Sequence, residues 1–133
     1  MKTRTKFYVS FSLTLFIVAF ICAAGYTTEL NAPDYDQYLV KALKDDNIGI
    51  RASAAQLLGE RKVETAVKPL VTMLKTEKNY AARIVAAIAL YQIGDEKVLP
   101  VLREVYKKDK NRTVKHVVAG IIKSMEEKQY AKN

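Results

Sequence analysis

The sequence has few of the residues that support redox, metal or hydrolytic chemistry. Among 133 residues there is one cysteine, one histidine and no tryptophan. The cysteine, Cys22, lies in an apolar N-terminal stretch, so the rest of the chain can form no disulfide and no thiolate metal site. With His116 as the only histidine, neither a histidine metal cluster nor a Ser-His-Asp arrangement can be assembled. The five glycines are isolated and form no phosphate-binding loop. We therefore expect no catalytic residue, no metal and no cofactor.

Acidic residues are absent before Glu29, whereas Lys2, Arg4 and Lys6 precede it. The net charge of +8 falls to about +5 once these three basic residues are removed. The remaining excess is spread along the chain and includes no arginine-rich run. This pattern argues against nucleic acid as the partner.

Residues 7–28 form an uncharged run of 22 residues that follows a basic start and ends in small residues. The pattern is typical of a secretory signal, with cleavage after Ala24 or Gly25. The run also exceeds the roughly 20 apolar residues that span a bilayer, so an uncleaved tether through residues 7–24 is the alternative. A lipoprotein is disfavoured because bulky Ile21 precedes the cysteine.

These observations predict a signal peptide or membrane anchor at 1–24 and a linker at 25–33. The folded part is then exported to the periplasm or outside the cell. If the leader is not cleaved, the protein is held at the inner membrane with its folded part outside the cytoplasm.

The chain repeats itself with a period of 32 residues. Asn47, Asn79 and Asn111 are separated by 32 residues and again by 32. The same offset aligns basic, small and large apolar residues: Arg51 with Arg83 and Lys115, Ala55 with Ala87 and Ala119, Leu58 with Leu90 and Ile122, and Tyr38 with Leu70 and Leu102. A fixed period with matching chemistry in many columns indicates stacked structural repeats.

Within each unit the apolar residues recur at helical spacing, which predicts two helices per unit. The breaks fall at Gly59, Gly94 and residues 45–47. The predicted pairs are 34–44 with 48–59, 64–75 with 79–93, and 95–107 with 111–127. Because such short pairs cannot bury their apolar faces alone, they must stack into one core. The predicted domain at 34–127 comprises units 34–60, 64–93 and 95–127, followed by a tail at 128–133.

Tyr38 and Tyr106 occupy apolar columns of the first helices, so we predict that both are buried. His116 is predicted on the surface of the last helix.

The second helices open with similar sequences, at residues 50–55, 82–87 and 114–119. Pro69 and Pro100 come early in the first helices of the second and third units. Together these features resemble HEAT repeats over about residues 34–125; armadillo repeats, with three helices and a longer period, fit less well. The resemblance implies an all-α, right-handed αα-solenoid of three HEAT-like helix pairs, preceded here by a hydrophobic leader helix. It implies scaffolding and protein binding, not chemistry.

The favoured interpretation is a non-enzymatic scaffold or adaptor, with a monomeric repeat domain, that binds a protein or peptide in the periplasm or cell envelope. The alternative is a non-catalytic supporting or regulatory subunit of an envelope enzyme complex. An enzyme acting alone and a nucleic-acid binder are less favoured, the latter because export separates the chain from nucleic acid.

In every unit an acidic residue stands six positions before a basic one. The pairs are Asp45 with Arg51, Glu77 with Arg83, and Asp109 with Lys115. This spacing places the acid in the turn and the base one turn into the second helix, so the charges of adjacent repeats can alternate as a structural ladder. The alternative is three unrelated surface ion pairs, each contributing about 0–1 kcal/mol.

The second helices are predicted to present a surface for the partner. Where a solvated helix face would be charged, the central one has apolar side chains. We predict a mild apolar strip suited to an extended peptide or an amphipathic helix. Its candidate residues are Gln56, Ile84, Val85, Ile88, Gln92, His116 and Val117. The alternative is that curvature of the stack lets neighbouring side chains cover these residues.

Overall fold

The computed structural model describes residues 32–131, and every regular element in that range is a helix. The predicted leader at 1–24 lies outside the described residues, and so does most of the predicted linker. The first helix begins at residue 32 rather than 34. It therefore includes the last two residues assigned to the linker.

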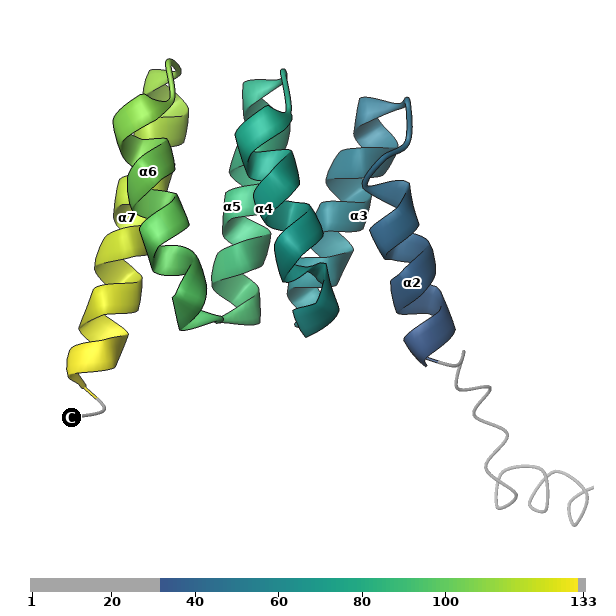
Figure 1. Cartoon of the computed structure of the whole chain (residues 1–133), viewed down its shortest axis with the longest axis horizontal. Coiled ribbons are helices and arrows are strands. Elements are labelled where there is room, and N and C mark those ends of the chain that lie inside the picture. Colours follow the sequence, from purple (N-terminus) through teal and green to yellow (C-terminus); the bar gives the residue numbers. More distant parts are fainter. Residues whose placement is uncertain (1–31, 132–133) are drawn as a thin grey trace, which may run out of the picture. The chain divides into compact units, whose positions relative to one another are not determined.

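Six α-helices form three antiparallel pairs that stand side by side (Figure 1). The pairs are α2 (Ala32–Ala42) with α3 (Ile48–Glu60), α4 (Val67–Thr76) with α5 (Tyr80–Ile93), and α6 (Leu99–Lys108) with α7 (Arg112–Tyr130). Single 3-10 turns, η1 (Glu64–Ala66) and η2 (Glu96–Val98), lead into α4 and α6. The predicted pairing of the helices is therefore confirmed, with ends that differ by a few residues.

An asparagine begins each second helix, and this explains its 32-residue spacing. The Oδ1 atom of Asn79 accepts the N–H groups of Ala81 and Ala82, at 2.8 and 3.3 Å. Asn47 and Asn111 cap α3 and α7 in the same way. The side chains satisfy backbone donors that have no partner within the helix, so each turn ends at a fixed residue.

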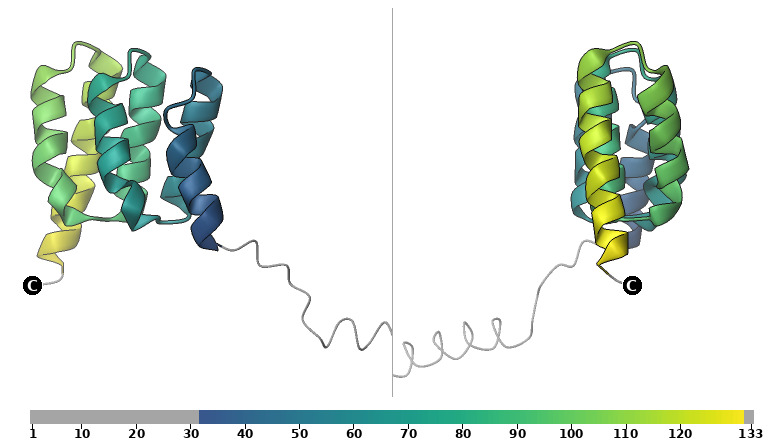
Figure 2. Two further views of the ribbon diagram at one scale, coloured as in Figure 1. Left: turned by 45° about the vertical axis from the view of Figure 1, so that its right-hand side comes forward. Right: turned by 90° about the vertical axis from the view of Figure 1, so that its left-hand side faces the viewer.

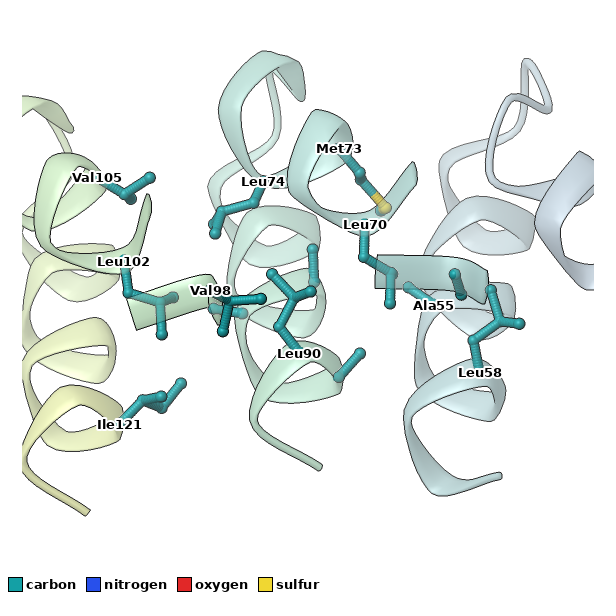
Figure 3. Close-up of a cluster of buried hydrophobic side chains, with 14 of the residues drawn as sticks. Ala55, Leu58, Leu70, Met73, Leu74, Leu90, Val98, Leu102, Val105 and Ile121 are labelled. Carbon is teal, nitrogen blue, oxygen red and sulfur yellow. The ribbon is translucent and has the colours of Figure 1, made fainter. Parts of the chain in front are cut away.

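The helices form two layers, which are seen along the stack in Figure 2: α2, α4 and α6 in one, and α3, α5 and α7 in the other. Within the second layer, α5 packs directly on both α3 and α7. Alanines allow this approach, since Ala55, Ala86 and Ala87 are completely buried. The first helices, with longer side chains, lie farther apart. Leucines between the layers, including Leu58, Leu70 and Leu90, fill the core (Figure 3).

Gly59 was predicted as a break, and this was wrong. It lies inside α3 and is buried against α5. A Cβ atom at this position would lie 2.6 Å from the Cα atom of Ala89, so only glycine fits. The chain turns three residues later, at Lys62, with a φ of 53°. Gly94 does end α5, in the left-handed conformation that glycine adopts readily.

The two tyrosines that were predicted in the core are exposed. Tyr38 is 64% and Tyr106 46% exposed. In α2 the buried residue is Leu39, one position after the expected column. The turn from α2 to α3 spans residues 43–47, two residues more than the turn at 77–79, and this changes the rotation of α2 relative to the repeat. Tyr106 is exposed because no fourth repeat covers α6.

Candidate partner-binding surfaces

The turns between first and second helices carry a chain of ion pairs that links successive repeats. Arg51 of α3 donates from Nε to Oε2 of Glu77, in the next turn, at 2.8 Å. Its Nη1 donates to the backbone oxygens of Asp45 and Asp46, in its own turn. The guanidinium group therefore joins the end of one first helix to the turn of the following repeat.

Arg83 makes the same connection one repeat later. It binds the carboxylate of Asp109 through two N–H groups, at 2.8 and 2.9 Å, and donates to the backbone oxygens of Glu77 and Lys78. The side chains of Arg83 and Asp109 are only 14% and 8% exposed. A two-pronged contact that is largely withdrawn from water is stronger than an ordinary surface pair.

The carboxylates respond to these contacts. The Arg51 guanidinium is the main reason that the pKa of Glu77 is lowered. For Asp109, burial is the largest single effect and raises the pKa. Hydrogen bonds from Arg83 and the Asn111 N–H, with the charges of Arg83 and Lys115, outweigh burial, so the pKa of Asp109 is lowered. Both groups are therefore held as carboxylates in the fold.

The chain of ion pairs runs between repeats, not within them. Among the described residues Asp45 has no ion-pair partner, and its carboxylate accepts the N–H of Asn47. At the other end, Lys115 donates to the backbone oxygen of Lys107, at 3.4 Å. The central Arg83 was expected to have acidic neighbours on both sides, but the carboxylate of Glu77 is turned to Arg51.

The predicted partner-binding strip lies on the layer of α3, α5 and α7, and its residues differ in exposure. Gln56, Ile88 and His116 are exposed, and Ile88 retains 41% of its surface. The side chains of Ile84, Val85 and Val117 are half-buried and pack against the core. The strip is therefore a narrow apolar surface centred on Ile88.

The two glutamines of this strip are both engaged. Gln92 was predicted at an open edge, but it is half-buried, and its side-chain oxygen lies over Gly59 at the seam between α3 and α5. Gln56 is exposed and donates to Glu60, at 2.8 Å. Of the two, Gln56 is therefore the one placed to meet a partner.

A second kind of surface, which sequence reasoning did not find, lies in the opposite layer. Because the first helices are farther apart than the second, open hollows lie between them. One lies between α4 and α6, and its lining includes Lys75, Glu104 and Lys108. Another lies between α4 and the end of α2, and its lining includes Lys44, Lys68 and Lys78.

The hollow between α4 and α6 is bridged by its own charges. The carboxylate of Glu104 accepts from Lys75 at 2.7 Å and from Lys108 at 2.9 Å. These two ammonium groups lower the pKa of Glu104 to about 2. The carboxylate is therefore charged at any ordinary pH, and it neutralises the lysines around it.

Within residues 32–131 no group of three or more histidine, cysteine or acidic side chains is arranged to hold a metal ion. In the same range, none of the helices has both the length and the apolar character needed to cross a membrane. His116, the only histidine, is exposed on α7.

Comparison with known proteins agrees with this geometry. A family model for HEAT repeats matches residues 37–122, which is more than half of the chain. No curated protein matches the sequence.

Proposed function

The chain belongs to the HEAT-repeat family, and from this premise we propose that it is a non-enzymatic scaffold that binds a protein or peptide in the periplasm or cell envelope. Stacked helical repeats commonly serve as binding surfaces, because the stack presents an extended face built from one helix of each repeat. The export part of the proposal is supported by the basic, apolar and small-residue pattern of the first 25 residues.

The observation that carries the binding proposal is the exposed Ile88 at the centre of the second-helix layer. A large apolar side chain that is 41% exposed beside half-buried Ile84 and Val85 offers a contact that loses water when a partner covers it. Exposed Gln56 and His116 on the two neighbouring helices provide polar groups on either side. This arrangement suits an extended peptide or one face of an amphipathic helix.

The stack is also held in one shape before any partner arrives. Arg51 and Arg83 tie the three turns together, and the alanine contacts hold α3, α5 and α7 closely packed. A surface that needs little ordering on binding loses less conformational entropy, so a modest contact area is sufficient for useful affinity.

Site-specific crosslinking in the native envelope tests the proposal. A photoreactive residue at position 88 is expected to give a discrete adduct with one envelope protein. The same residue at Tyr106, which is 46% exposed on the first-helix layer, serves as the matched control and is expected to give none. The partner is then identified by mass spectrometry, and its binding is measured with purified proteins.

The change Ile88→Glu is expected to abolish capture of that partner and to leave the melting temperature unchanged, because the side chain is outside the core. Ile84→Glu is unsuitable, since Ile84 packs against the core and its loss would unfold the protein. Equal adducts at positions 88 and 106, or normal binding by Ile88→Glu, would contradict the second-helix surface. A partner whose catalytic activity depends on this chain would instead support the role of an enzyme subunit.

A further inference from the structure

The hollow between α4 and the end of α2 is a distinct surface, on the layer opposite Ile88. Leu43, Pro69 and Met73 contribute apolar lining, with Met73 almost completely buried. Three exposed lysines, Lys44, Lys68 and Lys78, stand around it, and none of their ammonium groups has a carboxylate partner among the described residues. The one acidic residue that lines it, Glu77, is engaged by Arg51.

The 32-residue repeat allows a direct comparison with the hollow between α4 and α6. Thr72 in the first hollow corresponds to Glu104 in the second. Met73 corresponds to Val105, and Glu77 to Asp109, so the two hollows have equivalent positions. In the second hollow the carboxylate of Glu104 satisfies two lysines. In the first hollow the hydroxyl of Thr72 donates to the backbone oxygen of Lys68, at 3.2 Å, and supplies no negative charge.

We propose that the hollow between α2 and α4 binds an acidic, partly apolar segment of a partner protein, whose carboxylate occupies the place that Glu104 occupies in the next hollow. The three lysines provide the charge that recognises such a segment, and the apolar lining accepts a neighbouring aliphatic side chain. The site is separate from the second-helix surface, so a protein with both could hold two segments at once.

The composition of the chain disfavours the other occupants. Residues 1–31 contain a single acidic residue, Glu29, and therefore offer little to a lysine-lined hollow. A second copy of the chain has a net charge of +8 and would approach against repulsion. An acidic segment from another protein has the complementary charge.

The test uses the full-length chain and a fluorescein-labelled peptide of glutamates and leucines, with the glutamine and leucine version as the neutral probe. Fluorescence anisotropy measures both affinities. The acidic probe is expected to bind about tenfold more tightly than the neutral one, and the difference should shrink as salt screens the exposed charges.

The decisive variant is Thr72→Glu, which places a carboxylate where Glu104 stands in the next hollow. It is expected to weaken binding of the acidic probe by about tenfold, while Thr72→Gln, of the same size, should change it by less than about twofold. Ser53→Glu adds the same charge on the second-helix layer, where Ser53 is exposed, and should also have little effect. Thr72 is exposed, so the fold should tolerate both changes.

Equal weakening by Thr72→Glu and Ser53→Glu would overturn the proposal, since the probe would then sense only net charge. Equal affinity for the two probes would overturn it as well. Binding that appears only after residues 1–24 are removed would assign the hollow to the chain's own leader. Self-association abolished by Thr72→Glu would assign it to a second copy. None of these outcomes depends on the second-helix surface, which Ile88→Glu tests separately.

Discussion

The ion pair between Arg83 and Asp109 should contribute more to stability than any other charged contact described. The Arg83 side chain makes two hydrogen bonds to the carboxylate and two to backbone oxygens at the end of α4, all between 2.8 and 3.0 Å. Replacing Arg83 by alanine leaves the nearly buried carboxylate of Asp109 with the Asn111 N–H as its remaining hydrogen bond. Breaking one side of a buried pair costs about 3–5 kcal/mol, and a partly exposed pair costs less. We expect a loss of about 2–4 kcal/mol.

For a domain of this size, such a loss corresponds to a fall of roughly 10–20 °C in melting temperature. Lys115→Ala is the matched control, because Lys115 occupies the equivalent position in the last repeat. It makes a single hydrogen bond, at 3.4 Å, and should lower stability by less than about 1 kcal/mol. Circular dichroism melts and urea titrations measure both variants.

A double-mutant cycle of Arg83→Ala and Asp109→Ala isolates the pair itself from the hydrogen bonds to the backbone. The coupling energy is expected to be about 1–3 kcal/mol and to change little with salt, since the pair is largely withdrawn from water. Equal small losses for Arg83→Ala and Lys115→Ala, or a coupling near zero, would refute the conclusion that this contact holds the repeats together.

Three further predictions follow from the same structure. The pKa values of Glu77 and Asp109 are lowered by folding, so the unfolded chain binds more protons in acid; their stabilisation is complete above their ordinary values of 4.5 and 3.8 and is lost as the pH falls below these values. Melting temperatures should therefore drop below about pH 4.5, and a flat profile down to pH 2 would contradict this. Gly59→Ala should cost about 1–3 kcal/mol in urea titrations, because its Cβ would overlap α5. Gly120→Ala, where nothing lies within 4 Å, should gain up to about 1 kcal/mol, and equal effects of the two changes would refute the close contact at Gly59. Residues 25–133 should form a soluble, cooperatively folding helical monomer, whereas aggregation of that fragment, or recovery of the full chain only from membranes, would favour an uncleaved anchor.

The period of the sequence was sufficient to predict the fold class and the helix pairs. Helix periodicity and the asparagine caps are local properties, because each depends on residues within one or two turns of the chain. The 32-residue spacing then required equivalent pairs to stack, since one pair cannot bury its apolar face. Even the charges of the turns were visible as a regular acidic and basic spacing.

Local patterns were not sufficient where two physical explanations predict the same residue. Gly59 fits both a helix end and a close helix contact, and only the position of α5 shows that it is the second. Tyr38 followed the repeat in sequence, but the longer turn after α2 rotated it into solvent. A column of aligned residues gives the face of a helix only if the turns before it have the same length.

The surfaces were decided by tertiary structure alone. The sequence shows Thr72 aligned with Glu104, but not that both positions face hollows between first helices. It also shows the base that follows each acidic residue, but not that Arg51 and Arg83 reach forward to the next repeat. Sequence determines which residues share a helix face because that depends on the helical period. Which faces meet, and which charges remain without a partner, depends on distances between helices that are set only when the repeats pack.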